Sequence, residues 1–449
     1  MHDGIRGEWK DAALEQSGQF MTISFRALRK SATLRTILVF ASGNTLAMGL
    51  GVVGSFVQAR YIGPEDMGVF RTFGIAAGYL TFLQMGVFDG LQREIPLQMG
   101  RGDQAKAERA AAACLAWILF VSIACGVIFL GLAARAAMHR EWMQFWGWLA
   151  YTPAMIATFY GGYLGTTFRT GQQFIRLSKT SVIQAIVGSL ALPLMPLMGY
   201  FGACLRTAIT SLAGLLLLHR WRPMRVRPRI DWPGFREVIR IGVPLSGAGY
   251  IYTSLWVSME GSFVLAWYGV KALGLYSVAV FVRTVVTQLA QNMNQVMQVK
   301  IYEQYGRSNS VSECVRLVRK PTTIAFLASL PLVAVAWLAI PWAIGFFIPK
   351  YVDAAPMMQW IVLTMPLTFL SLPATILWAS GRGFYFFTPA IVGFLTFVGG
   401  AYLLHGLGIG VVGVLIASML GNLMYSLLSY ALIFFLGLER KLTMHNEEY

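Results

Sequence analysis

The sequence predicts an all-α integral membrane protein with about 12 transmembrane helices, arranged as two six-helix bundles around a central cavity. Three observations carry this prediction. Of the 449 residues, 56% are hydrophobic and 12% are charged, with a mean hydropathy of +0.60. About twelve apolar stretches reach the roughly 20 residues that a helix needs to cross a bilayer. The pattern of glycine and arginine residues next to the apolar stretches of the first half recurs in the second half.

Glycine and arginine mark this repeat at a fixed separation of 206 positions (269 minus 63). The matched positions are Gly63, Gly68, Gly100 and Arg101 with Gly269, Gly274, Gly306 and Arg307. In both halves a short loop precedes an apolar stretch, and a longer basic loop follows it. Internal repeats in a very apolar chain are typical of transporters. Because six spans are an even number, both halves enter the membrane from the same side, and a pseudo-two-fold axis is expected along the membrane normal.

The apolar stretches define the expected spans and, from them, the domains. The spans lie near 36–58, 68–91, 110–134, 145–167, 179–198, 201–219, 241–265, 272–297, 321–347, 353–380, 384–406 and 409–437. The predicted organisation is a cytoplasmic N-terminal tail with a surface helix (1–35), an N-terminal bundle (36–219), a basic cytoplasmic linker (220–240), a C-terminal bundle (241–437) and a cytoplasmic C-terminal tail (438–449). Within the linker, the apolar side of a short helix is expected on the membrane surface, at Trp232, Phe235, Val238 and Ile239.

Charge sets the expected orientation. The chain has 36 basic and 20 acidic residues, for a net charge of +16. Most of the basic residues lie in connections on one side of the predicted spans. The other side holds Arg60, Arg135, Arg140, Arg206, Lys271 and Lys350. Such a bias places the basic side in the cytoplasm, together with both termini, and accounts for the net charge without a nucleic-acid partner. Membrane lipids are the expected partners of the basic linker.

The sequence lacks the residues that several classes of function require. The four cysteines show no metal-ligand spacing, and no Walker motif, nucleophile elbow or dinucleotide fingerprint is present. The connections on the non-basic side are too short to form a catalytic domain. We therefore expect no enzyme activity, no catalytic residue, no metal and no cofactor, apart from a coupling proton or sodium ion.

The eighth span carries an unusually polar face. Between Phe281 and Lys300, six polar residues recur at helical spacing and share one side. They are Thr284, Thr287, Gln288, Gln291, Gln295 and Gln298, with Arg283 and Asn294 at the border. A helix cannot turn such a stripe to lipid, where unsatisfied polar groups cost several kcal/mol each. It faces either other helices or a water-filled cavity. From this stripe we predict Arg283, Gln288, Gln291, Asn294 and Gln295 as cavity residues that bind substrate.

Three charged residues in the spans require an explanation. Arg283 lies near mid-membrane, where it either binds a phosphate-bearing substrate or pairs with Glu260 of the preceding span. Glu260 in turn either pairs with an arginine or binds a proton or sodium ion for coupling. Arg71, just inside the second span, is a second candidate for substrate binding, with snorkelling to the surface as the alternative.

Several segments resemble the polysaccharide-transport family of bacterial flippases, which includes the O-antigen (Wzx-type) flippases and the capsule and exopolysaccharide exporters. The first is ARYIGPEDMGVFRTF (59–73), followed by GVFDGLQREIPLQMGRGD (86–103). The others are FRTGQQFIRLSKTSVIQAIVG (168–188), VLAWYGVKALGLYSVAV (264–280) and FFIPKYVDAAPMMQW (346–360). This family shares a superfamily of multidrug, oligosaccharidyl-lipid and polysaccharide exporters with the lipid II flippases and the multidrug and toxin extrusion antiporters.

The resemblance implies two six-helix bundles in a V around a cationic cavity, with a lipid-linked oligosaccharide as substrate. Arg71 and Arg283 suit contact with its diphosphate, and Glu260 matches an acidic position that many relatives carry in the seventh span. The resemblance also implies polysaccharide polymerases and glycosyltransferases as partners.

We therefore predict a flippase that moves a polyprenyl-diphosphate-linked oligosaccharide across the bacterial cytoplasmic (inner) membrane by alternating access, for surface polysaccharide synthesis. The first alternative is an ion-coupled multidrug antiporter of the same superfamily, because Glu260 suits the organic cations that such proteins export. The second is a membrane glycosyltransferase or ligase, against which the short outer connections argue.

Overall fold

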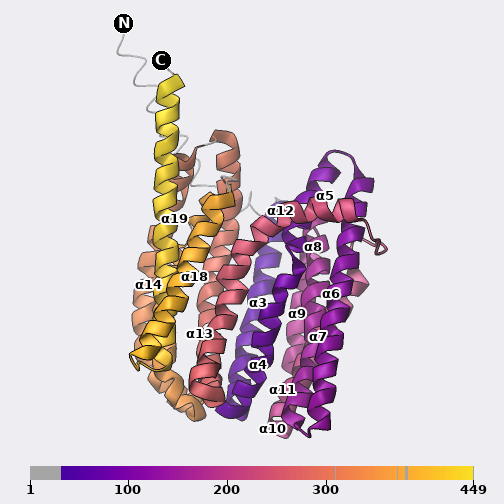
Figure 1. Ribbon diagram of the computed structural model, residues 1–449, viewed down its shortest axis with the longest axis vertical. Coiled ribbons are helices and arrows are strands. Elements are labelled where there is room, and N and C mark those ends of the chain that lie inside the picture. The colour runs from indigo at the N-terminus through magenta and orange to yellow at the C-terminus, as the bar shows by residue number, and fades with distance from the viewer. Residues whose placement is uncertain (1–31, 309, 372, 380–382, 448–449) are drawn as a thin grey trace.

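The computed structural model describes residues 32–308, 310–371, 373–379 and 383–447, and helices dominate this part of the chain. They form two lobes that stand side by side (Figure 1). The first lobe contains α3 (Ala32–Tyr61), α4 (Pro64–Leu80), η1 (Thr81–Gln84), α5 (Val87–Gly100), α6 (Gln104–Met138), α7 (Trp142–Ile156), η2 (Ala157–Gly161), α8 (Gly162–Thr170), α9 (Phe174–Leu190), α10 (Leu194–Met198) and α11 (Tyr200–Trp221).

The second lobe begins after an irregular stretch. It contains α12 (Trp232–Tyr250), η3 (Ile251–Leu255), α13 (Trp256–Ser308), α14 (Val311–Phe347), η4 (Pro349–Ala354), α15 (Ala355–Val362), α16 (Thr364–Leu370), α17 (Ala374–Ala379), α18 (Gly383–Gly406) and α19 (Val411–Glu447). We call the end of the molecule with the turn 101–103 and the stretch 222–231 the basic face. The other end, with the turns at 62–63 and 407–410, is the opposite face.

The predicted fold class is confirmed: the protein is an all-helical, multi-pass membrane protein with two helical lobes. Six helices of the described residues are long and apolar enough, by length and composition, to cross a membrane. One of them is Tyr200–Trp221, although Arg206 interrupts its apolar sequence. The exact domain boundaries proposed from the sequence remain predictions.

A glycine turn lies inside α13 and separates the predicted seventh and eighth spans. Gly269 has a φ of +81°, a left-handed conformation that a residue with a Cβ atom adopts only with strain. The chain reverses there, so that 256–268 and 270–308 form two arms of one hairpin. Gly63, the repeat partner of Gly269, precedes α4 in an extended conformation instead (φ −73°).

The two lobes meet at the opposite face through the glycines of the repeat. A methyl group on Gly68 of α4 would overlap the carbonyl oxygen of Val270 in α13. In the reciprocal contact, a methyl group on Gly274 would overlap the carbonyl oxygen of Pro64. Because position 270 is the repeat partner of 64, and 274 that of 68, the contact is symmetric about the axis between the lobes. Only glycine allows the two backbones to approach this closely.

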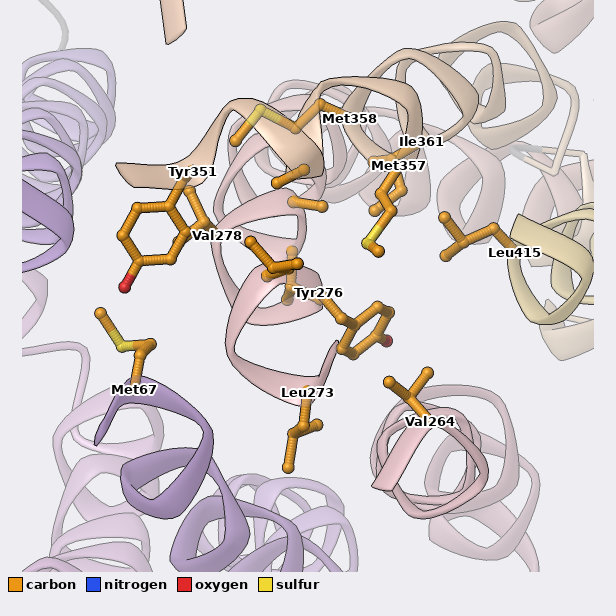
Figure 2. Close-up of a cluster of buried hydrophobic side chains, with 14 of the residues drawn as sticks. Met67, Val264, Leu273, Tyr276, Val278, Tyr351, Met357, Met358, Ile361 and Leu415 are labelled. Atoms are coloured by element: carbon orange, nitrogen blue, oxygen red, sulfur yellow. The ribbon is translucent and has the colours of Figure 1, made fainter. Parts of the chain in front are cut away.

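Buried side chains extend this contact between the lobes. Met67 of α4 lies beside Tyr351 of η4 in the largest hydrophobic core, with Val278 of α13 nearby (Figure 2). Tyr351 is fully buried, and its hydroxyl donates a 3.0 Å hydrogen bond to the carbonyl oxygen of Ile62 at the end of α3. The closure of the opposite face therefore depends on both apolar packing and a buried polar contact.

Tyr351→Phe tests the polar part of this closure. We expect the variant to lose about 1 kcal/mol of stability, since the ring still packs but one buried hydrogen bond between the lobes is missing. Thermal unfolding of the purified protein in detergent measures the change. Tyr61→Phe, at an exposed ring, is the matched control. Equal stability of Tyr351→Phe and wild type would contradict this role for the hydroxyl.

At the basic face, α12 crosses from the first lobe to the second (Figure 1). The carboxylate of Asp231 caps it by accepting a hydrogen bond from the backbone N–H of Gly234 at 3.2 Å. Lys106 of α6 forms an ion pair with Glu237 at 2.8 Å. The expectation of a membrane-facing apolar side is wrong for Phe235 and Val238. Both are buried in a core that helices of the first lobe form, so α12 is fastened to protein rather than to lipid there.

Candidate functional site

A cavity of about 510 Å³ opens beside the hairpin of α13. Its walls come mainly from the second lobe, namely from η3, both arms of α13, α16 and α19. The first lobe contributes Arg71 of α4. The sequence predicts a cavity between two equivalent halves, whereas the structure builds this one largely within the second half. The candidate site is therefore asymmetric despite the repeat.

Arg283 and Glu260 form a bidentate ion pair at the edge of this cavity. Arg283 Nη1 donates to Glu260 Oε2, and Nη2 donates to Oε1 at 3.1 Å. The hydroxyl of Tyr276 donates a further hydrogen bond of 2.7 Å to Oε2. The glutamate side chain is fully buried, whereas that of Arg283 is 15% exposed and lines the cavity. Of the two explanations open for Arg283, the structure forms the pair with Glu260.

The glycine turn explains why these residues meet. Glu260 and Arg283 lie 23 positions apart, on the two arms that Gly269 joins. Tyr276 lies on the second arm between them in sequence. Burial of a carboxylate and a guanidinium is costly, and the cost is offset only when the geometry is good and the remaining lone pairs find donors. The bidentate fork and the tyrosine hydroxyl provide both conditions.

Arg71 of α4 is the cavity residue that comes from the first lobe. Its Nε–H is buried and has no hydrogen-bond partner, and no carboxylate of the described residues lies within 4.0 Å of its guanidinium. A methyl group on Gly74 would lie 3.2 Å from the Tyr151 hydroxyl and 3.8 Å from Arg71 Nη1, which places the two side chains close together. Arg71 therefore lines the cavity as a cation that no carboxylate neutralises.

Only some residues of the polar stripe of α13 can be placed in the cavity wall. Thr284, Thr287 and Asn294 line the cavity, and Asn294 Oδ1 accepts a 2.7 Å hydrogen bond from the Thr375 hydroxyl. The predicted site residues Gln288, Gln291 and Gln295 belong to α13, but their side chains lie outside the described residues. The structure thus brings Arg71, Arg283 and Asn294 to one cavity, with Glu260 directly behind Arg283.

The cavity wall also contains a polar group that was not predicted from the sequence. The hydroxyl of Tyr252 donates to Asn422 Oδ1 at 3.0 Å, and Trp256 Nε1 donates to the Ser418 hydroxyl at 2.9 Å. Tyr252 also stacks on Tyr425, with 4.4 Å between the ring centroids. Asn422 within an apolar span was the available signal, since such residues seldom face lipid. Thr364, Thr368 and Ser371 gave no comparable signal in the sequence.

We next consider the side chains that could bind a metal ion. The described residues contain no group of three or more His, Cys, Asp or Glu side chains that could hold a metal ion. The four cysteines Cys114, Cys125, Cys204 and Cys314 are free and buried.

Comparison with solved structures identifies the fold. A multidrug resistance MATE family transporter of the MOP superfamily in an inward-facing conformation aligns with a TM-score of 0.71 and 17% identity, over 91% of this chain and 99% of that chain. The outward-facing conformation aligns with a TM-score of 0.65 and 17% identity, over 90% and 96%. A MOP superfamily transporter from Pyrococcus furiosus, described as having a binding pocket of reverse polarity, aligns with a TM-score of 0.67 and 17% identity, over 89% and 95%.

Sequence comparison gives a partial match. No family model matches the chain. A probable multidrug resistance protein NorM from Bradyrhizobium diazoefficiens is 25% identical over 156 residues, which is 32% of this chain and 32% of that protein. The match therefore spans about a third of the length of this relative.

These findings correct the function predicted from the sequence. The prediction of a flippase for a polyprenyl-linked oligosaccharide is wrong, because the inward-facing and outward-facing solved structures are those of a multidrug resistance MATE family transporter and the curated relative is a probable multidrug resistance protein. The comparisons do not support the resemblance to the polysaccharide-transport family.

Proposed function

We propose that this chain is an ion-coupled multidrug antiporter of the MATE type, which exports amphipathic organic compounds by alternating access. The observation that carries the proposal is the cavity beside α13, with the Arg283–Glu260 pair at its edge and the lobes in contact at one face. A charged pair buried beside a cavity in one of two movable lobes is a natural point at which ion binding and substrate binding are linked.

The proposed orientation places the basic face in the cytoplasm of the cell and the opposite face outside, in a bacterial inner membrane. The positive-inside bias of the connections supports it. In this orientation the α4–α13 contact closes the outer side, so the conformation corresponds to an inward-facing state. The higher TM-score with the inward-facing solved structure is in line with this assignment.

Competition for the carboxylate of Glu260 provides a coupling mechanism. Both of its oxygens now accept from Arg283, and Oε2 also accepts from Tyr276. A proton or a sodium ion that binds there displaces the guanidinium, which then turns toward the cavity. Because binding of the ion frees a cation at the substrate site, ion and substrate occupancy are linked in free energy.

The charges of the cavity favour one kind of drug. Glu260 is already engaged, whereas Arg71 carries a positive charge that no described carboxylate neutralises. Tyr252, Trp256 and Val257 add aromatic and apolar surface to the wall. We therefore propose that zwitterionic or anionic aromatic compounds are better substrates than simple organic cations.

Transport in proteoliposomes tests the proposed function. With an imposed proton or sodium gradient, we expect the purified chain to drive uptake of a fluorescent fluoroquinolone, a zwitterion, more strongly than uptake of ethidium, a cation. Gradient-independent uptake, or no uptake of either compound, would argue against a coupled antiporter.

Arg71→Gln tests the substrate preference in the same assay. We expect fluoroquinolone transport to fall about tenfold or more, since a hydrogen bond to a charged group contributes about 1.5–3 kcal/mol. Ethidium transport should stay equal or rise. Arg135→Gln, at an exposed arginine of α6 near the opposite face, is the control and should transport like wild type. Parallel loss for both compounds would show that Arg71 does not select the charge of the substrate.

A further inference from the structure

A second pocket, of about 350 Å³, lies at the basic face of the first lobe, away from the cavity. It forms where the beginning of α9 meets the end of α11 and the stretch that follows. Five basic side chains and one aromatic ring line it: Arg176, Lys179, Arg220, Arg222, Arg225 and Trp221. None of these residues lines the cavity beside α13.

The positive charge of this pocket is not balanced from within the protein. No carboxylate lines it, and the ion pairs of the described residues, Lys106–Glu237 and Arg283–Glu260, lie elsewhere. Arg176 Nη1 donates to Gln173 Oε1 at 3.0 Å, and Arg222 Nη1 bonds to the imidazole of His219, so these contacts are with neutral groups or ring nitrogens. Like charges gathered in one concave site repel one another, and a bound anion relieves this repulsion. Guanidinium forks fit the oxygens of a phosphate group in particular.

The surface next to the pocket indicates where such a phosphate comes from. Leu212, Leu216 and Arg220 follow one another at intervals of four residues and thus share one side of α11. Leu212 is 45% exposed and Leu216 is 66% exposed, and Ile186 of the adjacent α9 is 44% exposed. In a membrane-spanning helix pair, these exposed apolar side chains contact acyl chains. Trp221 lies at the end of α11, where tryptophan is typical of the membrane–water boundary.

We propose that this pocket binds the headgroup of an anionic phospholipid, whose acyl chains follow the exposed apolar side of α9 and α11. The basic pocket adjoins exposed apolar side chains. This combination matches a ligand with both a phosphate group and acyl chains, whereas a free phosphate ion would contact only the basic side chains. Five basic residues suit a headgroup with two phosphates, so cardiolipin is expected to bind more tightly than phosphatidylglycerol. This site is independent of the proposed transport function.

Lipid binding by the purified full chain tests the proposal, with native mass spectrometry as the readout. The test variant is Arg176→Gln/Lys179→Gln/Arg220→Gln. The control variant, Arg229→Gln/Arg236→Gln/Arg240→Gln, removes the same charge from exposed positions near the same face. We expect the test variant to bind cardiolipin about 100-fold more weakly, given the contribution of each basic residue near a membrane. The control should retain most of the affinity. Equal losses in both variants would mean diffuse attraction and would overturn the pocket.

Two further arms separate the lipid from other ligands and from misfolding. Inorganic phosphate at millimolar concentration should leave cardiolipin bound, whereas displacement at that concentration would assign the pocket to free phosphate. In wild type, cardiolipin with a photoreactive acyl chain should label α9 and α11 selectively. Labelling spread evenly over the lipid-facing helices would overturn the site without reference to any variant.

Discussion

Glu260→Gln is expected to abolish ion-driven transport and to destabilise the protein. The substitution removes the charge that balances Arg283, while Arg283 stays largely enclosed between the arms of α13. A buried charge that loses its partner typically costs about 3–5 kcal/mol. Thermal unfolding in detergent and gradient-driven uptake in proteoliposomes measure the two effects. Glu108→Gln, at an exposed glutamate of α6, is the control for the loss of a carboxylate.

The double variant Glu260→Gln/Arg283→Gln distinguishes a charge effect from a packing effect. With both charges absent, no unpaired charge remains in the membrane interior, so we expect much of the stability to return. Transport should not return, because no carboxylate is left to bind the coupling ion. If the double variant were as unstable as Glu260→Gln, packing around these side chains rather than the ion pair would explain the loss. Recovery of ion-driven transport would exclude Glu260 as the coupling site.

Gly274→Ala is expected to shift the protein toward a state that is open at the opposite face. The added methyl group overlaps the carbonyl oxygen of Pro64, which is backbone and cannot turn aside. Overpacking of this kind typically costs about 1–3 kcal/mol, enough to change the ratio of the two states about tenfold or more. The reciprocal variant Gly68→Ala should behave alike, since it overlaps Val270 in the same way.

The rate at which an engineered cysteine reacts reports this opening. Met67→Cys places a thiol in the contact between the lobes, where residue 67 is buried. A membrane-impermeant maleimide should label it about tenfold faster when Gly274→Ala is also present. Gly131→Ala in α6 is the matched control, because a methyl group there meets nothing within 4 Å. Equal labelling of Gly274→Ala and the control would mean that the glycine contact does not hold the face closed.

The sequence determined the fold class, because apolar stretches form helices and glycines form turns through local interactions. An apolar stretch of about 20 residues must be a helix in a membrane, whatever surrounds it. Gly269 and Gly274 were recognisable as special because their repeat partners occur 206 positions earlier. The polar stripe of α13 was likewise accessible, since helical spacing is a property of the sequence itself. The cost of a buried charge left the Arg283–Glu260 pair as one of two interpretations of Arg283.

Only the tertiary structure decided which of these features form the site. The cavity walls come from helices far apart in the chain, and residues such as Thr364 and Ser371 are ordinary within their own spans. From the repeat, the two halves were predicted to be equivalent. In the structure the cavity lies mainly in the second half, and Arg71 is the residue of the first half that lines it. The function was mispredicted for a related reason. Loose motifs at helix turns indicate a fold, whereas substrate choice depends on the charges that folding brings to one wall.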